Sequence, residues 1–294
     1  MRQCLFALAM IACLPAAAQL QPASSPMPPL PVSDHYFTTT DGMKLHYAKL
    51  GTAGSPVILI HGSGGAARTW LENGVAQALA KNHVVIVANM RGHGLSQGPR
   101  DGDMPLDVIE LMDHLKIDRA HIHGFSMGGS ILAQLMARVP HRIITAAFGG
   151  SGVREPEDLA ARVPPDVAGS DPDSDKIRAL YKQRQGERAK LDEEHKKQGL
   201  TGPKPGPRPG PARAELDLTK IDFPVLAIVG EFDNPNARTH RLWREVKNFQ
   251  MIRLPGKEHL TSYYPGTIPK TYIDSIVRFV NANDVAASPM TRRQ

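Results

Sequence analysis

The 294-residue sequence predicts an α/β fold: a doubly wound, mostly parallel sheet with an inserted, mainly helical cap. Two patterns lead to this fold class. Short apolar runs rich in β-branched residues, typical of strands buried on both faces, alternate with segments of helical periodicity. Such alternation builds a parallel sheet covered by helices. A charged and Pro-rich block, Arg154 to Ala214, then interrupts the alternation and is interpreted as an insertion over the sheet.

The individual elements follow from local patterns. The first is a β-hairpin, because the pair Asp41-Gly42 separates two strand-like runs at 35–40 and 44–48. The buried strands are predicted, in chain order, at 57–60, 84–87, 120–122, 143–148, 224–229 and 250–254. The core helices are predicted at 69–80, 106–115, 128–139 and 270–280. Within the insertion we expect a charged helix at 175–197 and a loop of alternating Pro and Gly at 202–211.

The N-terminal residues are typical of an export signal. Arg2 precedes an apolar run at 5–14 and the small residues 16–18, after which we expect cleavage. The protein is therefore expected in the periplasm or outside the cell. A lipoprotein anchored at Cys13 is the alternative. The predicted organisation is a signal peptide 1–18, a Pro-rich linker 19–34, a first core part 35–152, a cap insertion 153–215, a second core part 216–284 and a flexible tail 285–294.

Composition narrows the chemistry. Both cysteines, Cys4 and Cys13, precede the cleavage site, so the mature chain would have no disulfide and no thiolate nucleophile. The net charge of +6 is mild and lacks the dense basic stripe of a nucleic-acid binder. No zinc-type spacing and no phosphate-binding loop occurs, and no mature segment is apolar enough to form a stable membrane span. We therefore expect no metal, no cofactor and no nucleic-acid partner.

The candidate nucleophile is Ser126. Residues 124–128, Gly-Phe-Ser-Met-Gly, match the G-x-S-x-G pattern between a predicted strand and a predicted helix. That setting is typical of a nucleophile elbow, a strained turn that lifts the serine hydroxyl above the sheet. Glycines are required there because the two backbones approach too closely for a Cβ atom. The alternative is a Gly-rich turn with a bystander serine.

The sequence also predicts backbone donors for a developing oxyanion. Residues 61–65, His-Gly-Ser-Gly-Gly, follow the first buried strand, where acyl-transfer enzymes of this layout place one donor. The second donor is the N–H of the residue after the nucleophile. We therefore predict an oxyanion hole formed by the N–H groups of Ser63 and Met127.

A serine hydroxyl needs a base, and the base needs an acid that orients it. His259 lies between the last predicted strand and the closing helix, at the expected edge of the sheet. Asp233 follows the preceding strand and is the predicted acid, with Glu231 in reserve. The order of Ser126, Asp233 and His259 along the chain agrees with this assignment. We expect other histidines to have different roles: His93, His121 and His123 are predicted to be structural, and His240 is predicted to lie at the surface.

Six landmarks in order resemble the α/β-hydrolase fold superfamily, specifically the abhydrolase group with a serine nucleophile and a cap. They lie at 41–47, 61–62, 91–96, 124–129, 230–233 and 256–259. The resemblance implies that the insertion roofs the active site. Because the insertion has few large apolar residues, we expect a mobile cap that gates the pocket and supplies no catalytic group.

The resemblance also limits the reaction. The loop at 61–64 is similar to that of serine C–C bond hydrolases, but those have Trp after the base where this chain has Leu260. The elbow is similar to that of cofactor-free perhydrolases and haloperoxidases, which have Trp in place of Ser63. Hydrolysis of a carboxylic ester or similar acyl bond, through an acyl-enzyme intermediate and with a small molecule as substrate, is therefore expected. C–C bond hydrolysis, perhydrolysis and a non-catalytic binding protein are the alternatives.

Overall fold

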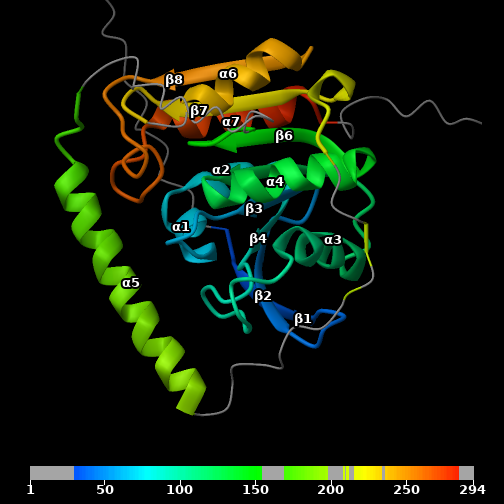
Figure 1. The fold of residues 1–294 in the computed structure, drawn as a ribbon, viewed down its shortest axis with the longest axis vertical. Coiled ribbons are helices and arrows are strands. Elements are labelled where there is room, and N and C mark those ends of the chain that lie inside the picture. The colour runs from blue at the N-terminus through cyan, green and yellow to red at the C-terminus, as the bar shows by residue number, and fades with distance from the viewer. Residues whose placement is uncertain are drawn as a thin grey trace, which may run out of the picture.

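The computed structural model describes residues 30–153, 169–197, 208, 210–211, 215–233 and 236–284. Its centre is an eight-stranded sheet with strand order β1-β2-β4-β3-β5-β6-β7-β8 (Figure 1). The strands are β1 (Ser33–Thr38), β2 (Lys44–Leu50), β3 (Pro56–Ile60), β4 (Val84–Ala88), β5 (Ala120–Phe125), β6 (Ile143–Gly149), β7 (Val225–Gly230) and β8 (Phe249–Leu254).

The sheet is mixed at one edge only. The pairings of β2 with β1 and with β4 are antiparallel, whereas the pairings from β4 through β3, β5, β6 and β7 to β8 are parallel. Seven helices accompany it in the described ranges: α1 (Ala67–Glu72), α2 (Val75–Leu79), α3 (Met104–His114), α4 (Met127–Arg138), α5 (Ser174–Lys197), α6 (Asn236–Glu245) and α7 (Lys270–Ala282). The predicted fold class is confirmed.

Helices cover both faces of the sheet and form two apolar layers. One layer joins α3, α4 and α6 to the sheet, with Val108, Leu132 and Leu242 fully buried. The other joins α1, α2 and α7, with Trp70 and Ile276 fully buried. Strands covered on both faces have no polar side, which explains the continuous apolar runs of the sequence. In these described ranges, no helix is both long and apolar enough to cross a membrane.

The helix predicted at 69–80 is wrong as a single element. The chain instead forms α1 and α2, which are separated at Asn73 and Gly74. Gly74 has a φ of +86°, a left-handed conformation that glycine adopts without strain. The side chain of Asn73 accepts a hydrogen bond from the N–H of Val75 (3.1 Å) and donates one to the carbonyl of Tyr263 (3.0 Å). The apolar periodicity continues across the break, and therefore hides it in the sequence.

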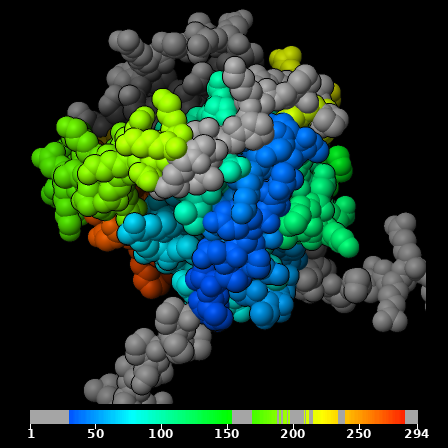
Figure 2. All heavy atoms as spheres, turned by 90° about the horizontal axis from the view of Figure 1, so that it is seen from below, coloured from blue at the N-terminus to red at the C-terminus, as the bar shows by residue number. Residues whose placement is uncertain are grey.

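The charged helix of the insertion is present as α5, which begins at Ser174 and ends at Lys197. In Figure 2 it stands at one side of the molecule, in green. The predicted signal peptide, residues 19–29 of the predicted linker and the whole predicted tail 285–294 lie outside the described residues, and residues 33–34 of the predicted linker already belong to β1. Most of the loop predicted at 202–211 also lies outside them.

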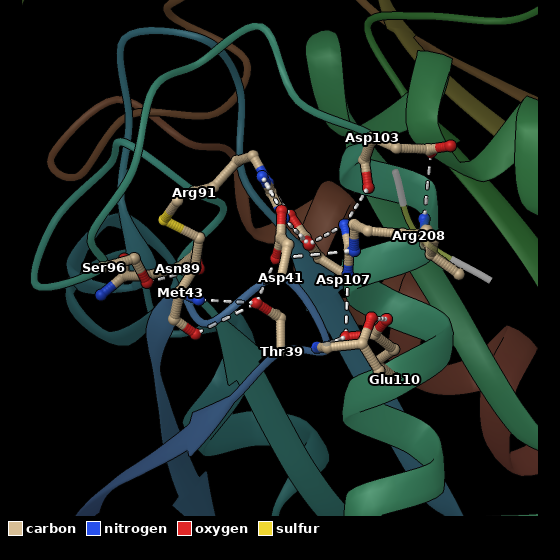
Figure 3. Close-up of polar contacts among 12 residues, drawn as sticks. Thr39, Asp41, Met43, Asn89, Arg91, Ser96, Asp103, Asp107, Glu110 and Arg208 are labelled. Atoms are coloured by element: carbon tan, nitrogen blue, oxygen red, sulfur yellow. Dashed lines mark hydrogen bonds and ion pairs between the residues drawn. The ribbon is translucent and has the colours of Figure 1, made fainter. Parts of the chain in front are cut away.

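Arg208, from that loop, is described and is not a solvated side chain. Its guanidinium is 5% exposed and contacts Asp107 (2.8 Å) and Glu110 (2.8 Å) of α3. Arg91 binds Asp107 and Asp41 beside it, so two arginines pair with three carboxylates at this corner (Figure 3). Because unpaired buried carboxylates are costly, this cluster fixes Arg208 against the hairpin and α3.

Two histidines of β5 are buried in the core, as predicted. His123 contacts the carbonyl of Ala147 (2.8 Å) through Nδ1 and the hydroxyl of Tyr272 (2.9 Å) through Nε2. A carbonyl only accepts, so Nδ1 carries the hydrogen and Nε2 accepts from the tyrosine. Burial lowers the pKa of His123 to about 4, and burial together with the nearby His83 lowers the pKa of His121 to about 4.

These lowered pKa values predict an acid-sensitive fold. Between pH 6.5 and 4 the unfolded chain binds protons that the folded histidines reject, so the free energy of unfolding falls as the pH falls through this window. The loss is at most about 1.4 kcal/mol per pH unit for each histidine. Urea unfolding at several pH values should therefore show a shallower pH slope for His121→Gln than for the parent protein. The surface variant His141→Gln should retain the parent slope, and equal slopes for all three proteins would contradict the prediction.

Candidate active site

Ser126 occupies a strained turn between β5 and α4. Its φ of +52° is rare for a residue other than glycine, and its N–H donates to the carbonyl of Gly149 (2.9 Å). A Cβ atom on Gly124 would lie 2.2 Å from the carbonyl oxygen of Gly128, and one on Gly128 would lie 2.3 Å from that of Ile60. Only glycine fits at either position. The local geometry is thus the elbow that the sequence predicts.

Three predicted residues come together in one chain of hydrogen bonds. His259 Nε2 lies 3.0 Å from Ser126 Oγ, and His259 Nδ1 lies 3.0 Å and 3.1 Å from the two carboxylate oxygens of Asp233. An ionised carboxylate only accepts, so Nδ1 carries the hydrogen. The lone pair of Nε2 then faces the Ser126 hydroxyl, which donates to it. This is the arrangement in which a histidine can take the serine proton.

The topology of the sheet explains why these side chains meet. Ser126 follows β5, Asp233 follows β7 and His259 follows β8, and these strands are parallel, so their carboxyl ends share one edge of the sheet. The Phe232 N–H donates to the carbonyl of Lys257 (2.9 Å) and ties the acid loop to the base loop. The imidazole of His259 packs on the ring of Phe125, at 4.9 Å between centroids.

Burial differs along this chain of contacts. The Asp233 side chain is 1% exposed, whereas that of His259 is 36% exposed. A buried carboxylate interacts strongly with its partner because little water screens it. The exposed side of the imidazole leaves room for a substrate beside Ser126.

Glu231, the reserve acid, points elsewhere. Its carboxylate accepts from the N–H of Gly256 (2.8 Å) and lies 3.9 Å from the guanidinium of Arg253. Glu231 therefore stabilises the turn after β8 and does not contact His259. The geometry favours Asp233 as the acid.

The predicted oxyanion donors flank Ser126. Met127 is the first residue of α4, where N–H groups have no partner within the helix and the helix dipole favours negative charge. Ser63 lines the same cavity as Ser126, and its carbonyl accepts from His93 Nε2 (3.0 Å). His61 Nε2 accepts from the N–H of Met90 (3.2 Å), so both buried histidines hold this loop in place. His93 is thus structural, as predicted, and His240 lies in α6 with its side chain partly exposed.

The cavity at Ser126 is small, about 70 Å³. Tyr181 of α5 closes it, lying so near Gly64 that a Cβ atom there would overlap its ring. A second, wider hollow of about 470 Å³ shares Ser63, Gly64 and Gly65 with the first and extends between this loop and α5. The sequence does not predict the role of Tyr181 in the pocket, because residue type and spacing do not show which part of the molecule a side chain of the insertion contacts.

Among the described residues, no group of three or more His, Cys, Asp or Glu side chains is arranged to hold a metal.

Comparisons with known proteins agree with this geometry. The family model described as alpha/beta hydrolase fold matches residues 55–204. A dihydrolipoyllysine-residue acetyltransferase component of the acetoin cleaving system of Cupriavidus necator is 35% identical over 118 residues, which are 39% of this chain and 31% of that protein. A 2-hydroxymuconate semialdehyde hydrolase of a Pseudomonas species is 36% identical over 105 residues, 34% of this chain and 37% of that protein. The match thus spans about a third of each curated relative.

Solved structures extend the similarity over most of the chain. A meta-cleavage product hydrolase from Pseudomonas fluorescens IP01 has a TM-score of 0.62 and 23% identity, over 84% of this chain and 97% of that one. A serine hydrolase from Cycloclasticus zankles has a TM-score of 0.62 and 20% identity, over 86% and 99%. At such identities the similarity establishes the shared fold alone.

The geometry of the site predicts that a side chain at position 150 would impair catalysis. This residue has a φ of +51°, and a Cβ atom on it would lie 2.9 Å from both Asp233 Oδ2 and His259 Nδ1. Gly150→Ala should push these two side chains apart and lower kcat at least about tenfold, since small displacements of reacting groups are costly. Steady-state kinetics with a small ester measures the effect.

The matched control is Gly186→Ala in α5, where an added Cβ atom meets nothing within 4 Å. It should leave kcat unchanged and stabilise the helix by about 0.5–1 kcal/mol. Equal activity of both variants would show that Gly150 does not constrain the Asp233–His259 contact.

Proposed function

Because the chain belongs to the alpha/beta hydrolase fold family, we propose that it is a serine hydrolase that cleaves a small carboxylic ester or similar acyl bond. One observation carries the proposal: the continuous contact from Ser126 Oγ through His259 to the buried Asp233, located at a strained elbow. A binding protein on this fold would not need to maintain a positive φ at Ser126, which costs about 1–3 kcal/mol.

The proposed reaction proceeds through an acyl-enzyme. His259 Nε2 takes the Ser126 proton while Oγ bonds to the substrate carbonyl carbon, and the N–H groups of Ser63 and Met127 stabilise the negative oxygen. The C–O bond to the alcohol then breaks, and His259 returns the proton to the departing alkoxide. Water, deprotonated by His259, attacks the acyl-enzyme and releases the acid and the free serine. Asp233 holds the imidazole in the required tautomer throughout.

The size of the cavity supports a small substrate group at Ser126. A volume of about 70 Å³ accommodates a short acyl group, and the apolar rings of Phe125 and Tyr263 border it. The hollow of about 470 Å³ next to it is the natural place for the remainder of the substrate.

C–C bond hydrolysis is the second candidate, because one relative is named a 2-hydroxymuconate semialdehyde hydrolase. The same three residues would serve that reaction. The residue after the base, Leu260, favours the ester. Offering an ester and an aromatic ring-fission product to the same preparation distinguishes the two reactions.

Replacement of the three central residues tests the proposal. Ser126→Ala or His259→Ala should lower kcat for a short p-nitrophenyl ester by about 10⁴- to 10⁶-fold, and Asp233→Asn by about 10³- to 10⁴-fold, because Asp233 acts only through His259. A fluorophosphonate probe should label the parent protein and not Ser126→Ala.

Glu231→Gln is the matched control for Asp233→Asn. It makes the same chemical change two residues away, on a carboxylate that faces Gly256. Its kcat should equal that of the parent protein. If Ser126→Ala retains a large share of the turnover, the assignment of the nucleophile is wrong.

Tyr181 should set the size of the substrate. Tyr181→Ala removes the ring that closes the cavity over Ser126, so kcat/KM should rise for esters with longer acyl chains relative to acetyl esters. The ratio of the two kcat/KM values is the measurement. Lys182→Ala, on the exposed side of the same helix, should leave the ratio unchanged. An unchanged ratio of the two kcat/KM values in Tyr181→Ala would show that Tyr181 does not limit the size of the substrate.

A further inference from the structure

The first half of α5 packs against the body of the protein through Ile177 and Tyr181. Ile177 is 2% exposed and belongs to the apolar layer under α1 and α7, and Tyr181 packs against Tyr264 with 6.0 Å between ring centroids. One turn later Arg184 contacts Glu72 (2.6 Å). Beyond residue 184 the described side chains of the helix are nearly all exposed. The start of α5 is therefore the part whose position matters for the site.

The start of α5 and the residues just before it contact the base loop, residues 257–261, through two ion pairs of opposite polarity. The buried Asp171 lies 2.9 Å from Lys257 Nζ, and Arg178 lies 3.0 Å from the carboxylate of Glu258. The N–H of Asp171 also donates to Glu258 (3.2 Å). Lys257 and Glu258 directly precede His259 in the chain. Two crossed pairs resist both sliding and rotation of the loop relative to the cap, which a single pair does not.

Asp171 is held as a charged group. Burial raises its pKa, but hydrogen bonds from the Thr261 hydroxyl and the Asp173 N–H, together with Lys257, outweigh burial and bring the pKa below its usual value. Its carboxylate thus remains available to Lys257 at neutral pH. Since the exposed fraction of the Asp171 side chain is 2%, solvent screens this pair little.

The remainder of the loop transmits this restraint to the imidazole. The N–H of Glu258 donates to Thr261 Oγ1 (2.9 Å), and Ser262 Oγ donates to the carbonyl of His259 (2.9 Å). The carbonyl of Lys257 accepts from Phe232, next to Asp233. The backbone of the base is consequently fixed on one side by the acid loop and on the other by the cap.

We propose that Asp171 and Arg178 are positioning residues, which hold His259 in reach of Ser126 through Lys257 and Glu258 when the cap is docked. The same docking places Tyr181 over Ser126, so closure of the pocket and alignment of the base are one event. Departure of α5 opens the pocket and simultaneously releases the base loop. The inference rests on the proposed serine-hydrolase function. The sequence predicts a cap that only gates the pocket, and the inference adds that the cap also positions the base.

The kinetic test uses Asp171→Asn and Arg178→Gln with a p-nitrophenyl acetate substrate, the smallest ester of the series. Each variant should lower kcat by about tenfold, with little change in KM, because the base is misplaced while the small substrate still enters. Lys182→Gln, a charge-neutralising change on the exposed side of α5, is the matched control and should behave as the parent protein. If kcat for the acetate is unchanged and only larger esters are affected, the cap is a lid alone and the proposal is overturned.

A double-mutant cycle separates positioning from general damage. If Arg178 acts through Glu258, Arg178→Gln and Glu258→Gln together should cost no more in kcat than the more harmful single variant. Additive losses would overturn the assignment of this pair. Both side chains of the pair are partly exposed, so neither variant leaves a fully buried charge unpaired.

Hydrogen exchange tests the coupling without catalysis. In Asp171→Asn and Arg178→Gln the amides of 258–264 should exchange faster than in the parent protein, while those of 225–229 in β7 remain protected. If the parent protein cleaves no ester but this exchange pattern is found, the proposed function fails and the coupling stands. Unchanged exchange at 258–264 overturns the coupling whatever the activity.

Discussion

The left-handed backbone of Ser126 is the constraint on which the rest of the site depends. A positive φ at a non-glycine residue costs about 1–3 kcal/mol, and persists only where the surroundings leave no alternative. Here β5 is buried along its whole length at the centre of the sheet, and α4 packs against β5 and β6. Gly124 and Gly128 have no Cβ atom, which allows the two elements to approach. The strain is therefore supported by a fully buried strand and the helix packed on it, and the hydroxyl is presented at the edge where β7 and β8 end.

Much of the fold was predictable because its signals are local. Apolar runs indicate buried strands, and glycines spaced around a serine between a strand and a helix indicate a nucleophile elbow. The break at Gly74 was missed because the apolar spacing continues through it. Asp233 is the acid that the sequence predicts, but Glu231 stays in reserve, since both follow β7 within three residues. The structure separates the two carboxylates: Asp233 contacts His259, and Glu231 accepts from the N–H of Gly256.

The residues that sequence reasoning missed act across long distances in the chain. Nothing near Gly150 in the sequence shows that Asp233 and His259 pack on its Cα, and nothing near Tyr181 shows that it lies over Gly64. The partners of the charged residues in the insertion are likewise distant in the sequence and could not be predicted from it. A charged run is usually a solvated face, yet Arg208 is buried among Asp41, Asp107 and Glu110, and Asp171 is buried against Lys257. Composition shows how many charges a segment has and cannot show which of them have partners.

The proposal that the cap docks and departs gives its charged side chains a physical reason. An apolar cap surface would be exposed to water whenever the pocket opened, at about 25 cal/mol for each Å² of apolar area. Charged side chains such as Arg178 and Glu258 are well solvated when apart, so their separation costs little, and exposed pairs contribute only about 0–1 kcal/mol when together. The geometric precision of an ion pair is retained nonetheless, because a guanidinium and a carboxylate meet in a defined orientation. Weak but directional contacts beside His259, with a few apolar anchors such as Ile177, allow a cap to align the base on closing without holding the site shut.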